Sequence, residues 1–385
     1  MAKKETKMMK VYLDNASTTK LDEEVSKEIA KCASESYGNA SSIHSYGVEA
    51  GKLLEKAREK IAKSINARAE EIVFTSGGTE SNNLAILGAL KKVSGKRKKV
   101  IISRIEHPSV MNLAEKIKEF GFEVLYAEVD SKGVVELEKL KKLVNENTTL
   151  VSIMHANNEI GTIQPIVEIG KLCRKVGALF HSDAVQSYMK VEIDVVKMNV
   201  DLMSFSGHKI HGPKGVGALY VRKGVGLEPM LIGGGQERGL RAGTENVPGI
   251  AGFAKAIERV NLGDLGKMKK LRDKIISRVL KEIPNSRLNG DREKRIVNNA
   301  HFSFDFVEGE AIVLRLDARG IAVSTGSACS SQELKPSYVL LALGLKQEQT
   351  HGSIRVSLSK YTSEEEADYF VDSLKEVVEG LRKNR

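Results

Sequence analysis

The sequence has no tryptophan, only seven prolines and three cysteines, and no apolar run long enough to cross a bilayer. A membrane-spanning helix needs about 20 apolar residues, so an integral membrane protein is not expected. The cysteines are widely spaced and form no CxxC pair, which argues against a disulfide framework and against a structural zinc site. The Lys-rich start lacks the apolar core of a signal peptide. We therefore expect a cytoplasmic protein.

The chain is basic, but its positive charges are not gathered in a pattern that predicts a nucleic-acid-binding surface. Its formal net charge is +10 over 385 residues, with 29% charged and 41% hydrophobic residues. The excess lies in residues 3–10, 91–99 and 382–385, that is, at the two ends and in one expected helix-to-strand connection. A binding face for nucleic acid would need these charges on one folded surface. Nucleic acid is therefore not expected as the main ligand, although a weak patch for RNA stays open.

Short apolar runs alternate with helical patterns from about residue 50 to 220. A helix is expected over 166–176, and similar Lys/Glu/Leu segments lie between most of the other apolar runs. This alternation predicts an α/β domain on a mainly parallel sheet, in which ligands bind where strands end. The expected buried strands are 71–76, 99–103, 123–129, 149–156, 178–184, 201–206 and 217–221.

The last third of the chain has a different pattern. A long charged helix is expected over 262–282, followed by a strand over 295–304 and a helix over 309–317. A second strand over 353–358 and a final helix from Ser363 complete the segment. This order predicts a smaller α+β domain docked on the first.

The segment FTSGGTESNN, residues 74–83, places two glycines and Thr79 between a strand and a helix. Glycine allows close approach of the backbone, and a helix N-terminus favours a phosphate. The alternative is an ordinary tight turn. The segment is not a nucleotide P-loop, because GxxxxGK[ST] does not occur, and GGGQERG fails the GxGxxG pattern at Arg238.

Two charged residues lie at or after the ends of two expected strands that are consecutive in the sequence. Asp183 ends one strand, where a carboxylate needs a cation or strong donors. The ring nitrogen of a pyridinium cofactor is one such partner, and a helix N-cap is the alternative. Lys209 follows the next strand beside Ser206 and His208, where its amine could form an imine with an aldehyde cofactor. The alternative for Lys209 is an ordinary surface lysine. A metal site at His208 and His211 is not expected, because no further ligand lies at a suitable spacing.

Nine motifs together resemble the cysteine desulfurases of the NifS/IscS type, within the class V aminotransferase family. They occur in order, and the resemblance runs from about residue 11 to about residue 375. The motifs are YLDNASTT (12–19), YGNASSIHSYG (37–47), FTSGGTESNN (74–83), EHPSV (106–110), NNEIGTIQPI (157–166), HSDAVQ (181–186), MSFSGHKIHGPKGVGALYV (203–221), GGGQERGLRAGTEN (233–246) and STGSACSS (324–331).

The resemblance implies a pyridoxal 5′-phosphate enzyme of transferase fold type I, active as a homodimer. It implies a large cofactor-binding domain over 17–259 with a mainly parallel seven-stranded sheet. The small α+β domain would comprise 1–16 and 260–385 and would carry the cysteine loop and the substrate arginine.

The resemblance also assigns roles to individual residues. Lys209 would form the Schiff base, Asp183 would partner the pyridine nitrogen, Gln186 would lie near the phenolic oxygen, and His107 would stack on the ring and move protons. Gly78, Thr79, Ser206 and His208 would hold the phosphate, with Thr244 supplied by the other subunit. Asn158 and Arg355 would bind the substrate carboxylate, Arg355 through a bidentate pair.

Cys329 is the third element of the implied mechanism. Buried helix positions are expected for Cys32 and Cys173, whereas the resemblance makes the Cys329 thiolate the acceptor of sulfur from L-cysteine, leaving L-alanine and a persulfide. The implied function is sulfur supply for iron–sulfur cluster assembly through a scaffold protein or another acceptor, with tRNA thiolation as a further use. The sequence ends at VVEGLRKNR (377–385). Bacterial IscS-type enzymes continue into a tail that helps dock the scaffold, so the mode of docking is left open.

Two alternative functions are compatible with the same residues. One is a different reaction on the same scaffold, either selenocysteine lyase or an aminotransferase, and Cys329 disfavours the aminotransferase. The other is a binding protein that delivers sulfur without catalysis, which the presence of Lys209 and Asp183 disfavours.

Overall fold

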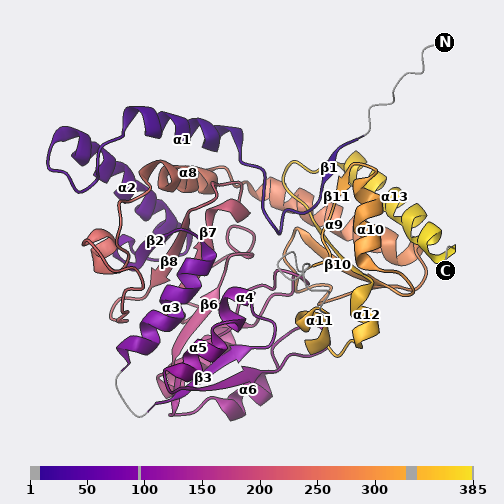
Figure 1. The fold of residues 1–385 in the computed structure, drawn as a ribbon, viewed down its shortest axis with the longest axis horizontal. Coiled ribbons are helices and arrows are strands. Elements are labelled where there is room, and N and C mark those ends of the chain that lie inside the picture. The colour runs from indigo at the N-terminus through magenta and orange to yellow at the C-terminus, as the bar shows by residue number, and fades with distance from the viewer. Residues whose placement is uncertain (1–8, 94–96, 327–335, 384–385) are drawn as a thin grey trace.

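The computed structural model describes residues 9–93, 97–326 and 336–383. Two bodies of secondary structure lie side by side, one built mainly from the first two thirds of the chain and one from the last third (Figure 1). No helix in these described ranges is both long and apolar enough to span a membrane.

The larger body contains the expected seven-stranded, mainly parallel sheet. Its order is β2-β8-β7-β6-β5-β3-β4, and only β8 runs antiparallel to its neighbours. The strands are β2 (Ile72–Thr75), β3 (Lys99–Ser103), β4 (Glu123–Ala127), β5 (Thr148–Ser152), β6 (Leu179–Asp183), β7 (Leu202–Ser206) and β8 (Gly217–Val221).

Helices cover both faces of this sheet, which explains why its strands read as continuous apolar runs. In β3, Ile101 packs toward α2, α7 and α8, whereas Val100 and Ile102 pack toward α3, α4 and α5. The helices of this body are α1 (Glu23–Glu35), α2 (Ser45–Ser64), η1 (Ala69–Glu71), α3 (Gly78–Lys92), α4 (Pro108–Met111), α5 (Ala114–Glu119), α6 (Leu137–Leu143), α7 (Ile166–Val176), η2 (Gly207–Lys209), η3 (Gln236–Gly239) and α8 (Val247–Glu258).

The smaller body has a three-stranded antiparallel sheet of order β12-β10-β9, packed against α9, α10 and α13. A separate parallel pair, β1 with β11, brings the start of the chain to this body. The elements are β1 (Val11–Tyr12), α9 (Leu262–Glu282), β9 (Ser286–Leu288), β10 (Asn299–Phe304), α10 (Gly309–Asp317), β11 (Ile321–Ala322), α11 (Tyr338–Ala342), α12 (Gln347–His351), β12 (Ser353–Ser357) and α13 (Glu364–Lys383).

The helices expected over 166–176, 262–282 and 309–317 are confirmed at both ends. The expected strand over 149–156 was too long, because β5 ends at Ser152. Beyond Ser152 the pairing continues on the β6 side, where Ile153 N and His155 N donate to the carbonyl oxygens of His181 and Asp183, whereas Met154 N donates to the buried Glu106 carboxylate. The strand expected from residue 295 begins at Asn299.

The domain boundaries at 16/17 and 259/260 stay a prediction. Val11 and Leu13 pack in the core of the smaller body, as that division expects. Val339, Leu340 and Leu343, in and just after α11, pack instead in the core of the larger body. The segment 336–343 therefore lies at the junction of the two bodies.

Candidate active site

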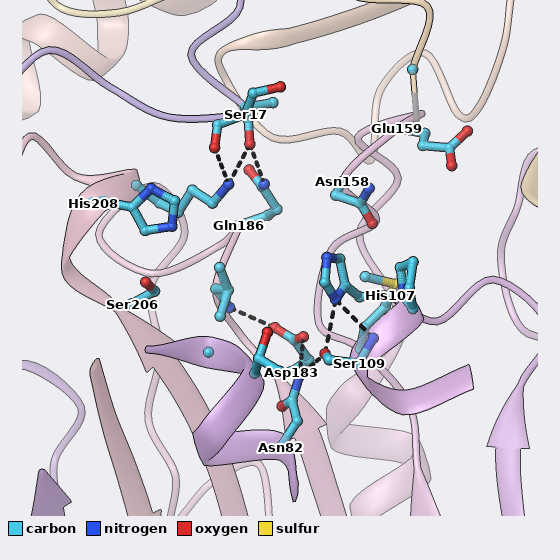
Figure 2. A pocket seen from close by; sticks show the side chains of 18 of the residues that line it. Ser17, Asn82, His107, Ser109, Asn158, Glu159, Asp183, Gln186, Ser206 and His208 are labelled. Carbon is cyan, nitrogen blue, oxygen red and sulfur yellow. Dashed lines mark hydrogen bonds between the residues drawn. The ribbon is translucent and has the colours of Figure 1, made fainter. Parts of the chain in front are cut away.

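A pocket of about 320 Å³ lies at the carboxyl edge of the large sheet, where it meets the smaller body (Figure 2). Parallel strands present their carboxyl ends at one edge, so the connections that follow them converge there. Ten of the residues singled out in the sequence line this single pocket: Gly78, Thr79, His107, Asn158, Asp183, Gln186, Ser206, His208, Lys209 and Arg355.

Lys209 lies in the 3₁₀ turn η2, directly after β7. Its Nζ donates to the carbonyl oxygens of Ala16 and Ser17, both at 2.6 Å. The N-terminal segment is held against η2 by Thr19, whose backbone N–H and hydroxyl both donate to the His208 carbonyl. The lysine is therefore held in the pocket wall and is not the ordinary surface lysine that was the alternative.

Asp183 ends β6, and both of its carboxylate oxygens have protein donors. Val185 N donates to Oδ1 at 2.9 Å, and Asn82 Nδ2 donates to Oδ2 at 2.7 Å. The contact with Val185 N lies in a turn, and no described helix begins directly after Asp183, so the helix N-cap that was the alternative is not what the structure shows. Asn82 adds a second restraint from α3, which fixes the carboxylate in the pocket.

A hydrogen-bonded chain connects Asp183 to His107 (Figure 2). Asn82 Nδ2 also donates to Ser109 Oγ at 2.8 Å, and Ser109 Oγ lies 2.8 Å from His107 Nδ1. Ser109 N donates to the same Nδ1, so the neutral ring carries its proton on Nε2. Burial lowers the pKa of His107; the negative charge of Asp183 opposes this shift, and the positive charge of Lys209 adds to it. His107 is therefore a neutral imidazole near pH 7.

One end of the pocket has the features of a phosphate site. Helix α3 begins at Gly78, and its N-cap, Gly77, supplies no side-chain hydrogen bond. A Cβ on Gly78 would lie 2.6 Å from Val185 Cγ2, so the residue must be glycine for the turn to approach this closely. Ser206 and His208 line the same pocket. Burial lowers the pKa of His208 to about 3, which keeps its ring neutral.

This donor set fits pyridoxal phosphate. The pocket offers an amine, a fixed carboxylate for a ring nitrogen, and a helix N-terminus with a hydroxyl and an imidazole for a phosphate. Gln186 donates through Nε2 to the Ala16 carbonyl, while its buried Oε1 has no partner among the described residues. A buried polar atom without a partner is costly, and a bound group would relieve that cost.

Arg355 and Asn158 lie across the pocket from α3. Arg355 comes from β12 of the smaller body, and its side chain is almost fully buried. It donates to the carbonyl oxygens of Asn158 and Gly326, to Asp14 Oδ1 and to Ser17 Oγ. The guanidinium thus joins the smaller body, the N-terminal segment and the connection after β5.

Two buried acids stand beside these groups. Burial raises the pKa of Glu106 to about 8, although Ser103 and Met154 N donate to its Oε1. Burial also raises the pKa of Glu159, which lines the pocket and accepts from Ser337 Oγ at 2.6 Å. Glu106 is therefore mostly uncharged at pH 7, which limits like-charge repulsion with Asp183.

The remaining predicted residues lie elsewhere. Thr244 is exposed and does not line this pocket. Cys329 falls outside the described residues. Cys32 and Cys173 are buried in α1 and α7 as expected, and burial raises the pKa of Cys173 to about 12. His211 is buried, and its Nδ1 lies 2.8 Å from the Lys20 carbonyl.

Sequence reasoning missed Asn82, Ser109, Asp14 and Ser17 as members of the site. All four lie inside motifs that carried the resemblance, but nothing in their type or spacing distinguished them. A short polar residue near a helix start or in a turn is most often a local cap. Only the partner across the pocket shows that Asn82 bridges Asp183 and Ser109, or that Asp14 pairs with Arg355.

Known proteins resemble the chain over nearly its whole length. The model of the aminotransferase class-V family matches residues 11–370. Cysteine desulfurase IscS of Dictyoglomus turgidum is 49% identical over 375 residues, covering 97% of this chain and 95% of that protein. Cysteine desulfurase IscS 1 of Archaeoglobus fulgidus is 49% identical over 374 residues, covering 96% and 97%. The solved structure of a NifS-like protein has a TM-score of 0.90 at 42% identity, covering 97% of this chain and 100% of that one.

Proposed function

The chain belongs to the aminotransferase class-V family, and we propose that its pocket is the active site of a cysteine desulfurase that uses pyridoxal 5′-phosphate. The enzyme converts L-cysteine to L-alanine and passes the sulfur to a cysteine thiol as a persulfide. One observation carries the proposal. An amine from the end of β7 and a fixed carboxylate from the end of the adjacent β6 line one pocket of cofactor size, in a chain 49% identical to cysteine desulfurases.

Different residues of the pocket would hold different parts of the cofactor. Asp183 would meet the ring nitrogen, and the start of α3 with Ser206 and His208 would hold the phosphate. When bound, the cofactor supplies an aldehyde for covalent attachment and a ring that accepts electrons released at the substrate. Asn82 keeps Asp183 in place through a 2.7 Å hydrogen bond.

Two groups would move protons during the reaction. The Lys209 amine is held by the Ala16 and Ser17 carbonyl oxygens, so its position does not depend on solvent. Neutral His107 carries its proton on Nε2, because Ser109 N donates to Nδ1. A neutral imidazole does not release its own N–H proton near pH 7, so His107 would act by taking up a proton and then returning it from the imidazolium.

Arg355 and Asn158 would receive the substrate carboxylate, and Cys329 would receive the sulfur. In that transfer the substrate C–S bond breaks, a bond forms between the substrate sulfur and the Cys329 sulfur, and the substrate carbon takes up a proton. L-Cysteine and a protein thiol therefore yield L-alanine and a persulfide, with no external oxidant needed. A solved structure of SspA in complex with cysteine has a TM-score of 0.82 at 34% identity, which supports the choice of substrate.

The direct test is the product balance with L-cysteine under a reductant. We expect one alanine for each sulfide released. Lys209→Ala should abolish both products, because no other lysine lines the described pocket, whereas Lys214→Ala at an exposed neighbouring position should not. Cys329→Ser should still change the cofactor absorbance on adding L-cysteine but should release no sulfide, and Cys32→Ala serves as its control.

The alternatives predict different products. Sustained alanine formation by Lys209→Ala would refute the role of that amine. Desulfuration by Cys329→Ser at the normal rate would assign the acceptor to another thiol. A strong preference for selenocysteine would favour a selenocysteine lyase, and transfer of the amino group to a 2-oxo acid would favour an aminotransferase. A preparation that binds no cofactor would support a binding protein.

The assembly and the acceptor are part of the same proposal. A homodimer would bring the exposed Thr244 of each subunit to the phosphate of the other site. The sulfur would supply iron–sulfur cluster assembly through a scaffold protein, or another acceptor such as a tRNA-modifying enzyme.

A further inference from the structure

Arg355 has little hydrogen-bonding capacity left for a substrate. A guanidinium has five N–H donors. Nη1 donates to the Asn158 and Gly326 carbonyl oxygens at 3.0 and 2.9 Å, and Nη2 donates to Asp14 Oδ1 and Ser17 Oγ at 2.9 and 2.7 Å. The remaining donor, Nε, is buried and has no partner among the described residues. A carboxylate that binds two donors of this guanidinium must therefore replace at least one protein acceptor.

Asp14 is the only charged member of these four acceptors. Its side chain is 20% exposed, and the Arg355 side chain is 3% exposed. Ser17 Oγ donates to the same Asp14 oxygen at 2.8 Å. The Asp14 backbone forms a β-bridge with Ser357, two residues beyond Arg355 on β12. The carboxylate is thus fixed beside the guanidinium by its backbone and by a hydroxyl.

Binding of a second carboxylate to this guanidinium gains little free energy while Asp14 is charged. That carboxylate either replaces Asp14, exchanging one charged hydrogen bond for another, or binds beside Asp14 and is repelled by a like charge at short range. The three neutral acceptors would hold Arg355 in its orientation even without the Asp14 charge. Removing only that charge should therefore strengthen carboxylate binding without freeing the arginine.

We propose that Asp14 sets the affinity of the pocket for amino acids, as an internal carboxylate that competes with the substrate carboxylate for Arg355. The consequence is weak retention of L-alanine, so the product leaves the pocket. This inference rests on the carboxylate-binding role of Arg355 in the proposed function.

The test compares Asp14→Asn with the unchanged holoenzyme. Asparagine keeps the shape and an acceptor oxygen but removes the charge. We expect L-alanine, titrated against the absorbance of the bound cofactor, to bind about two- to fivefold more tightly to Asp14→Asn, the upper part of the range for one partly exposed ion pair. KM for L-cysteine should fall by a similar factor. A gain in affinity is a result that mere structural damage would not produce.

A matched control exists outside the pocket. Asp273 pairs with another buried arginine, Arg272, at 2.6 Å on α9, and Asp273→Asn removes the same charge there. It should leave alanine binding unchanged. Ser17→Ala removes a neutral acceptor of Arg355 and keeps the charge, so it should not tighten binding. Asp14→Ser, which also removes the charge, must shift alanine binding in the same direction as Asp14→Asn.

Arg355→Gln separates this inference from the proposed function. If Arg355→Gln loses alanine binding while Asp14→Asn binds alanine unchanged or more weakly, the inference about Asp14 is wrong and the role of Arg355 stands. If Arg355→Gln binds alanine as tightly as the unchanged protein, Arg355 does not hold the carboxylate, and both are wrong.

Discussion

His301 is an ionisable side chain that the fold holds uncharged. It is fully buried on β10, with Asn289 Nδ2 at 2.9 Å from its Nδ1, and its Nε2 has no partner among the described residues. Burial lowers its pKa to about 3, and the charges of Arg355 and Arg295 act in the same direction. His181, inside the large sheet, is also buried, with its pKa lowered to about 3 by the same cause.

This burial predicts a loss of stability in acid. Above about pH 6.5 the histidine is neutral in both the folded and the unfolded chain, so it contributes no pH dependence. Below that pH only the unfolded chain takes up the proton, and each such histidine lowers the free energy of unfolding by about 1.4 kcal/mol per pH unit, down to the folded pKa.

Urea unfolding at pH 7.5 and 5.5, with cofactor at one saturating concentration, tests His301→Gln. The loss of stability between these pH values should be about 1.4 kcal/mol smaller in the variant than in the unchanged protein. His351→Gln, at an exposed position, should leave the loss unchanged. An equal loss in His301→Gln would mean that His301 takes up its proton in the folded state.

At the scale of one element, the turn η3 has an unfavourable backbone conformation that a buried ion pair stabilises. Glu237 and Arg238 both have positive φ, 47° and 57°, which is unfavourable for residues other than glycine. The Glu237 carboxylate is buried and paired with Arg58 on α2 through two contacts of 2.8 Å, and it also accepts from Phe74 N on β2. This ion pair ties η3 to the strand that leads into Gly78 and Thr79.

Breaking that pair should be strongly destabilising. Arg58→Met leaves the Glu237 carboxylate buried without its cation, and we expect a loss of about 3–5 kcal/mol in the free energy of unfolding by urea. Lys60→Met, two residues along α2, removes an exposed ion pair with Glu258 and should cost less than about 1 kcal/mol.

The double variant Arg58→Met/Glu237→Gln removes the buried charge as well. It should recover part of the loss, because the unpaired carboxylate is the main source of the penalty. If Arg58→Met and Lys60→Met lowered the free energy of unfolding equally, the buried ion pair would contribute no more to stability than the exposed one.

At the scale of the whole molecule, large apolar side chains on the body that carries the sheet remain uncovered. Ile43, between α1 and α2, is 98% exposed, and Ile232, ahead of η3, is 93% exposed. Tyr37, in the same connection, and Tyr46, at the start of α2, are exposed as well, and their ring centroids lie 5.5 Å apart. A concentration of such residues is typical of a protein interface, and here it supports the proposed homodimer.

Sedimentation equilibrium of the holoenzyme should therefore give a dimer. Ile43→Glu and Ile232→Glu should shift it toward monomer and weaken cofactor retention, since Thr244 of one subunit would serve the other site. Leu314→Glu on α10 of the smaller body, at a side chain 70% exposed, should leave the dimer intact. A monomeric unchanged protein, or dissociation only in Leu314→Glu, would contradict the assembly.

The sequence by itself determined the elements and the residues that end them. Local periodicity predicts the seven strands of the large sheet and the helices α7, α9 and α10. The same pattern locates the glycines at the start of α3 and the polar residues that end β6 and β7. Because parallel strands place their carboxyl ends at one edge, the order of strands and helices predicts Asp183 and Lys209 at the same edge of the sheet, whereas the pairing of β6 with β7 comes from the structure.

Only the tertiary structure decided which polar groups meet and which are buried. Asp14 and Arg355 are 341 residues apart in the chain, and Asn82 is 101 residues from Asp183, so no local pattern relates them. The raised pKa of Glu106 likewise depends on packing by segments distant in sequence. Secondary structure follows from short-range periodicity, whereas hydrogen-bond partners and desolvation depend on how the two bodies pack, and that is settled only in the folded chain.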